Sequence, residues 1–233
     1  MRKLQILMLV VLLSFLSVFT TYKLNSEKID ISKTRSEISY GKVSDIDGNV
    51  YRTVKIGDQW WMAENLRVTH NPEGKLIESY APNGDPESIL VYGRLYSWNV
   101  AMNGTPSERT RGIAPKGWHI PNNDDWQVLF DHLGGVDIAG GKMKEAGTLH
   151  WREPNVGATN SSGFSAVPSG GLIPPDKYHG FPFAVHYLSS TGKGSNASWP
   201  SISNSVNTKS TGKNVYILSA PKNFPVAIRC VKD

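Results

Sequence analysis

The chain has 233 residues, of which 39% are hydrophobic, and its 25 Lys and Arg against 20 Asp and Glu give a formal net charge of +5. This apolar content excludes a wholly disordered chain, and the single cysteine excludes an internal disulfide and any multi-cysteine metal site. The basic residues are scattered rather than clustered, so the sequence predicts no nucleic-acid-binding surface.

Residues 1–21 form an apolar segment with positive charge at its start. Arg2 and Lys3 precede a run at 4–19 that is apolar at all but three positions. This order is typical of an export signal, and the run also approaches the length of a membrane-spanning helix. We therefore predict either a cleaved signal peptide or an uncleaved N-terminal membrane anchor. Both place the rest of the chain outside the cytoplasm, as a secreted, periplasmic or cell-surface protein.

The next segment, residues 22–40, is polar and carries charges of both signs. It is predicted to be a linker to one folded domain at 41–233. No cysteine occurs within the first 40 residues, so a lipid-modified N-terminal cysteine is excluded.

Short segments of alternating apolar and polar residues at 42–62 predict a β-meander. Asp47-Gly48 is typical of a two-residue hairpin turn. The acidic residues around this turn do not fit an EF-hand calcium loop, which needs glycine at its sixth position and glutamate at its twelfth. Counted from Asp45, the glycine is fourth and the twelfth residue is Ile56. We therefore interpret this segment as a turn.

The clearest helix is predicted at 123–133. Asn122 and Asp125 have the spacing of a capping box, and Gly134 provides an end. Four apolar residues recur with the helical period: Trp126, Leu129, Phe130 and Leu133. This stripe is expected to face the core.

Weaker patterns predict a short helix at 64–68 and helical structure within 93–102. Beyond the glycine pair at 140–141 the chain is rich in turn-forming residues. The segments 155–171 and 192–212 are dense in Gly, Ser and Asn, which predicts long surface loops.

Residues 45–66 resemble the opening of the Fibrobacter succinogenes major paralogous domain. The later blocks that match, in the same order, are YGRLY at 92–96, PKGWHIP at 115–121, DW at 125–126, AGGKMK at 139–144, SGFSA at 162–166 and RCVK at 229–232. The resemblance extends over residues 43–233, and the blocks are specific when taken together. It implies a module of a secreted or surface protein, in a family with no established reaction.

The block at 117–126 is also similar, more distantly, to formylglycine-generating and sulfatase-modifying enzymes, which share a C-type-lectin-like architecture. This similarity implies an α+β, C-type-lectin-like domain with short antiparallel strands, one or two helices and long irregular loops. In that architecture the first and last strands pair, which would place residues 50–56 beside 228–231. The matching blocks imply structural roles for Trp60, Trp61, Gly117, Trp118, Pro121, Trp126 and Cys230.

Three positions depart from the family pattern. Relatives usually carry a cysteine at the position of Ala114, which would bridge the cysteine near the C-terminus. Without that partner, Cys230 is expected to be a free, buried thiol. Leu188 stands where tryptophan is common, and residues 172–175 replace aromatic and basic residues. Ligand properties of relatives therefore do not transfer to these segments.

The sequence contains no recognisable catalytic constellation. Formylglycine-generating enzymes need two active-site cysteines, and this chain has one. It has no G-x-S-x-G motif, and its six histidines show no metal-ligand spacing. His119, which follows Trp118 inside a structural block, is predicted to be a hydrogen-bonded scaffold residue. We therefore predict no catalytic residue, no metal site and no cofactor.

Exposed aromatic side chains are the candidate contacts for a ligand, because sugar rings and peptide side chains can stack on them. Tyr178, His179 and Phe181 lie in a segment rich in Pro and Gly, where recognition residues often occur. The alternative is that these three only cover the core beneath a loop. Most tryptophans are predicted to be core residues, while the roles of Trp151 and Trp199 stay open.

The sequence favours an exported, non-catalytic binding or surface-interaction module. Its expected partner is an extracellular glycan or a cell-surface protein, with no nucleic acid, while the N-terminal segment contacts the membrane. A structural component of the envelope without a small ligand is the alternative. An enzyme related to the sulfatase-modifying factors is a third hypothesis.

Overall fold

The computed structural model describes residues 38–204, 206–207 and 210–233. The predicted signal or anchor at 1–21 lies outside the described residues, as does most of the predicted linker at 22–40. Among the described residues, none of the helices has the length and apolar character needed to cross a bilayer.

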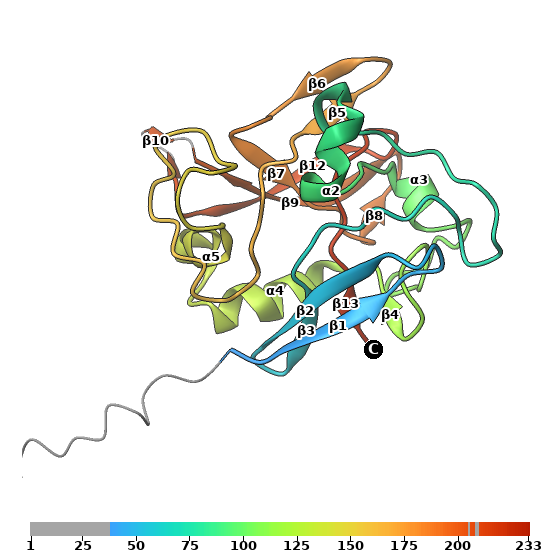
Figure 1. The fold of residues 1–233 in the computed structure, drawn as a ribbon, viewed down its shortest axis with the longest axis horizontal. Coiled ribbons are helices and arrows are strands. Elements are labelled where there is room, and N and C mark those ends of the chain that lie inside the picture. Colours follow the sequence, from blue (N-terminus) through green and yellow to red (C-terminus); the bar gives the residue numbers. More distant parts are fainter. Residues whose placement is uncertain (1–37, 205, 208–209) are drawn as a thin grey trace, which may run out of the picture. The chain divides into compact units, whose positions relative to one another are not determined.

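A five-stranded antiparallel sheet forms one side of the domain (Figure 1). Its strand order is β1 (Tyr40–Ser44), β2 (Val50–Ile56), β3 (Gln59–Met62), β13 (Val231–Lys232) and β4 (Trp118–His119). The predicted meander at 42–62 is confirmed. The predicted pairing of 50–56 with 228–231 is wrong, because β3 lies between β2 and the C-terminal strand. Val231 pairs with Trp61 on one side and with His119 on the other.

A second sheet contains β7 (Ala184–His186), β9 (Asn196–Ser203) and β12 (Val215–Pro221), and β8 (Gly192–Lys193) also pairs with β9. Two hairpins complete the strands: β5 (Gly171–Ile173) with β6 (Lys177–His179), and β10 (Val206–Asn207) with β11 (Ser210–Thr211).

The prediction of a long surface loop at 192–212 is therefore wrong. Small polar residues suggested a loop, but β9 pairs along its length with β12 and buries Trp199 and Ile202, so tertiary packing outweighs local propensity. The surface loop predicted at 155–171 is irregular as expected, yet most of its second half is buried.

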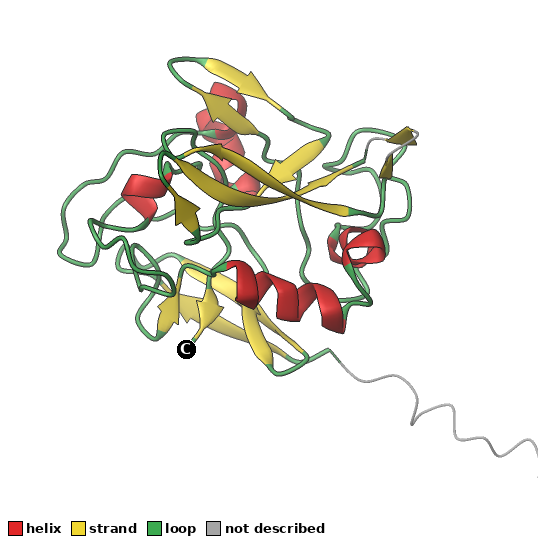
Figure 2. Ribbon diagram, turned by 180° about the vertical axis from the view of Figure 1, so that it is seen from behind, coloured by secondary structure: helices red, strands yellow, loops and turns green. Residues whose placement is uncertain are grey.

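Among the described residues the longest helix is α4 (Asn123–His132), which confirms the prediction at 123–133. Both halves of the capping box between Asn122 and Asp125 are formed, and the predicted apolar stripe is buried. Figure 2 shows α4 beside the five-stranded sheet. The remaining helices are short: η2 (Pro82–Gly84), η3 (Pro86–Ser88), α2 (Ile89–Tyr92), α3 (Trp98–Ala101) and α5 (Val136–Met143).

Helix α5 was not predicted, because it contains the glycine pair at 140–141, after which the sequence indicated a turn-rich region. Both positions require glycine because the backbone of another segment lies too close to leave room for a side chain. A Cβ atom at Gly140 would lie 2.5 Å from the carbonyl oxygen of Asn214, and one at Gly141 would lie 2.6 Å from that of Gly157. The glycines let the helix pack directly against the loop before β12 and against the backbone at Gly157.

The helix predicted at 64–68 is wrong, and only α3 forms within 93–102. Leu66 instead donates its backbone N–H to Ile228, 3.0 Å away, and accepts from the N–H of Arg94 at 2.9 Å. Backbone pairing with two distant segments thus replaces local helical bonds.

The core lies between the two larger sheets. One cluster joins side chains of β2, β3, α4, β7, β9 and β12. A second contains Tyr51, Tyr96, Trp118 and Cys230. Trp151 and Trp199, whose roles the sequence left open, are both buried in these clusters. The architecture is α+β, with antiparallel strand pairs and few helices, as predicted.

Cys230 is a free, fully buried cysteine, and Ala114 belongs to the same apolar cluster. Burial raises the pKa of this thiol well above its usual value, which keeps it protonated and unreactive. We therefore expect a thiol reagent to label Cys230 only after denaturation, as followed by intact mass at pH 8. Rapid stoichiometric labelling of the native protein would contradict this burial.

Candidate functional site

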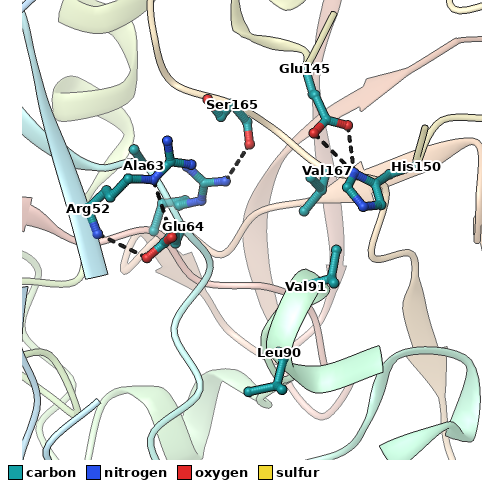
Figure 3. A pocket seen from close by; sticks show the side chains of 10 residues that line it. Arg52, Ala63, Glu64, Leu90, Val91, Glu145, His150, Ser165 and Val167 are labelled. Carbon is teal, nitrogen blue, oxygen red and sulfur yellow. Dashed lines mark hydrogen bonds and ion pairs between the residues drawn. The ribbon is translucent and has the colours of Figure 1, made fainter. Parts of the chain in front are cut away.

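The candidate site is an open cleft of about 180 Å³ between the five-stranded sheet and the segment that follows α5 (Figure 3). Its lining combines charged and aliphatic side chains. Those that matter chemically are Arg52, Glu64, Leu90, Glu145, His150 and Arg229.

One wall is formed by Arg52 on β2 and Glu64 just after β3. The Glu64 carboxylate accepts from the backbone N–H of Arg52 at 2.9 Å and forms an ion pair with its Nε at 3.4 Å. The backbone N–H of Ala63 in turn donates to the Arg52 carbonyl, 2.8 Å away. Glu64 is thus held against the sheet by backbone contacts as well as by charge.

The opposite wall is formed by Glu145 and His150. The two oxygens of Glu145 lie 2.8 and 3.0 Å from Nδ1 of His150, and the imidazole meets the ring of Tyr92 edge-on at 5.6 Å. Both side chains remain partly exposed. Figure 3 shows this pair across the open space from Arg52 and Glu64.

Arg229 forms the base of the cleft and is fully buried. Its guanidinium donates to Oδ1 of Asn65 at 2.6 Å and to the carbonyl oxygens of Met62, Phe164 and Ser165. No ion pair with a carboxylate holds it among the described residues, so its charge is met chiefly by these neutral acceptors. Burial lowers its pKa from the usual value. These bonds tie the end of β3 to the loop at 164–165.

Leu90 and Val91 on α2 form an aliphatic edge of the cleft. Leu90 is 81% exposed and Val91 is 45% exposed. Single exposed aliphatic side chains are common on protein surfaces, but these two are adjacent to each other and to the charged groups of the cleft. An aliphatic edge beside two carboxylates offers both apolar and polar contacts to a ligand.

The three predicted contact residues do not line this cleft. Tyr178 packs partly against the core, and the ring of His179 lies 5.1 Å from that of His186. Phe181 meets Tyr92 edge-on at 5.1 Å, on the ring that also supports His150. Phe181 is therefore connected to the cleft through one intervening side chain.

The predicted structural residues have the following positions. Trp61, Trp118, Pro121, Trp126 and Cys230 are buried, Trp60 is partly buried against the second cluster, and Gly117 lies in an exposed turn.

His119 is a scaffold residue, as predicted. Its nitrogens lie 3.1 Å from Asp125 and 2.7 Å from Asp233. Burial opposes protonation, but these hydrogen bonds outweigh it and raise the pKa of His119.

The cleft residues were not identified from the sequence. Arg52, Glu64 and Arg229 lie in the matching blocks, but they are separated by many residues, and only the strand pairing brings them together. Within the described ranges, no group of three or more His, Cys, Asp or Glu side chains could hold a metal ion.

Comparison with known proteins gives one positive result. The family model described as Fibrobacter succinogenes major domain matches residues 54–232. Neither the curated proteins nor the solved structures include a match to the chain.

Proposed function

Because the chain belongs to the Fibrobacter succinogenes major domain family, we propose that it is an exported, non-catalytic binding module that recognises a glycan through the cleft between Glu64 and Glu145. Export rests on the apolar segment at 1–21, and the lack of catalysis rests on the missing constellations in the sequence. A C-type-lectin-like architecture is part of the proposal and rests on the distant resemblance at 117–126.

The observation that carries the proposal is the exposed aliphatic edge beside paired charged groups. Carboxylates accept hydrogen bonds from sugar hydroxyls, and guanidinium groups donate to their oxygens. Leu90 and Val91 can cover the C–H face of a sugar ring. Because Glu64 and Glu145 are already held by Arg52 and His150, they would meet a ligand without much reorganisation.

The lining of the cleft is the reason to propose a glycan before a cell-surface protein. Carboxylates and a guanidinium group beside an aliphatic edge match the hydroxyl groups and the C–H face of a sugar ring. A glycan array probed with the full chain, in a detergent that lacks a sugar headgroup, would identify the ligand.

Two variants test the site once a glycan is captured. We expect Leu90→Ser and Glu145→Gln each to raise the dissociation constant about tenfold, since a contact worth about 1.4 kcal/mol is lost. Isothermal titration calorimetry would measure this. The matched control is Leu76→Ser, since Leu76 is 77% exposed and does not line the cleft.

Three results would contradict the proposal. Failure to capture any glycan would favour a structural envelope component. Capture that is unchanged in both cleft variants would place the binding site elsewhere. Capture of a surface protein, weakened by the same variants, would replace glycan recognition with protein recognition at this cleft.

A further inference from the structure

Two histidines on strands of different sheets, β6 and β7, lie against each other in the domain. His179 ends β6 and His186 ends β7, and their ring centroids are 5.1 Å apart. The ring of His186 also lies 5.9 Å from that of Trp199 on β9. The β5–β6 hairpin thus contacts β7 partly through these two imidazoles, whose planes are tilted by 38°.

Each imidazole has a buried nitrogen with no hydrogen-bond partner, Nε2 in His179 and Nδ1 in His186. A neutral imidazole has one nitrogen without a proton, so each ring can keep its bare nitrogen at the buried position. Protonation would place an N–H there with no acceptor. The surroundings leave little room for a new one, since a Cβ atom at Gly171 would lie 2.9 Å from Nε2 of His179.

The charges around the pair also oppose protonation. Lys177 acts on His179 from the same strand, and His179 acts on His186. The other groups that pack against the rings are the indole of Trp199 and the glycine backbone at 171 and 180, which do not titrate. Burial is the larger cause and lowers the pKa of His186 to about 4, while the pKa of His179 is also lowered.

We propose that the β5–β6 hairpin is an acid-sensitive element that regulates the cleft: protonation of the His179–His186 pair releases the hairpin from β7 and loosens the wall that carries His150. The effect on the ligand rests on the proposed function, whereas the release of the hairpin does not.

The route from the hairpin to the cleft is short and continuous. Phe181, two residues beyond β6, meets Tyr92 at 5.1 Å, and Tyr92 supports the ring of His150 at 5.6 Å. The backbone N–H of Arg152 donates to the carbonyl oxygen of Pro182 at 3.0 Å. Displacement of residues 181–182 therefore removes one hydrogen bond from the segment that holds His150 and one contact from Tyr92, on which the ring of His150 rests.

The direction of the pH effect follows from the lowered pKa. In the closed state, with the hairpin against β7, the pKa of His186 is about 4. In the open state, with the hairpin released, His186 has the ordinary histidine pKa of 6.5. The closed state therefore loses stability relative to the open state as the pH falls between these two values. If His186 is fully exposed in the open state, lowering the pH from 7 to 4.5 reduces the ratio of closed to open molecules by about 50-fold.

Hydrogen exchange of the full chain tests the release directly. After correction for the intrinsic exchange rate, we expect amides at 171–183 to lose about 50-fold in protection between pH 7 and pH 4.5. His186→Phe keeps an aromatic ring between His179 and β9 but cannot titrate, so the protection of these amides should change less than about threefold. His132→Gln, at an exposed histidine of α4, is the control and should respond as the wild type does.

Folding of each variant is checked at pH 7 by near-ultraviolet circular dichroism. If His186→Phe does not fold, His179→Phe takes its place, with a reduced response expected. A pH response in the folded His186→Phe variant equal to that of the wild type overturns the proposal, as does constant protection in the wild type.

Binding is then measured separately with the captured glycan. Weaker binding at pH 4.5 in the wild type, but not in His186→Phe, supports regulation of the cleft. Release of the hairpin with unchanged affinity overturns that regulation. If no glycan is captured, the proposed function fails while hydrogen exchange still decides whether the hairpin is acid-sensitive.

Discussion

Replacing Trp126 with alanine should lower the free energy of unfolding by about 3 to 5 kcal/mol, the usual cost of truncating a large aromatic residue in a core. Trp126 is 1% exposed and lies at the centre of a ring cluster. Its centroid lies 4.6 Å from that of Trp61 on β3 and 5.5 Å from that of Tyr187 near β7. The variant would leave a cavity where α4 meets both sheets.

Urea denaturation at pH 7 would measure this loss, and Trp126→Phe is the matched control. The indole Nε1 of Trp126 is buried without a hydrogen-bond partner, so phenylalanine removes an unsatisfied donor while it keeps most of the ring. Its cost should stay below about 1.5 kcal/mol. A decrease of less than about 1 kcal/mol in the free energy of unfolding of the alanine variant would mean that the ring cluster contributes little to stability.

Local signals in the sequence were sufficient for elements whose residues are close together in the chain. The β1–β3 meander depends on alternation and on the turn at Gly48, and α4 depends on its capping box and its apolar stripe. All of these are readable within a dozen residues. The same local patterns were misleading for α5, whose glycines are required by close contacts with distant backbone, and for β9, whose strand structure comes from pairing with β12.

The cleft could not have been predicted in the same way. Arg52 and Glu64 become neighbours through the β2–β3 pairing, and Arg229 reaches them because β13 adds to β3. Glu145 and His150 lie on the opposite wall because α5 ends beside the loop at 164–166, where Glu145 donates its N–H to Ala166 at 3.0 Å. The sequence pointed instead to aromatic residues at 178–181, and one of them, Phe181, contacts the ring that supports this wall.

Replacing Arg229 with methionine should destabilise the protein by about 3 to 5 kcal/mol, as when one partner of a buried polar network is removed. Methionine is apolar and of similar length, so the change removes hydrogen bonds more than volume. It would leave Oδ1 of Asn65 and three backbone carbonyl oxygens without the guanidinium donors. Each buried acceptor left unpaired costs about 1 to 3 kcal/mol. The guanidinium also lies over the ring of Phe164 at 4.6 Å, so the ring cluster would lose a cation–π contact.

The comparison with Arg52→Met separates burial from charge. Arg52 is 58% exposed in its side chain and is paired with Glu64, whereas Arg229 is buried and bonded chiefly to neutral acceptors. An exposed ion pair is worth about 1 kcal/mol or less, so Arg52→Met should cost little. Equal losses in the two variants, measured by urea denaturation at pH 7, would show that burial of Arg229 is not what makes it important. A large loss in Arg229→Met alone would mean that the base of the cleft and the joint between β3 and the loop at 164–165 depend on one side chain.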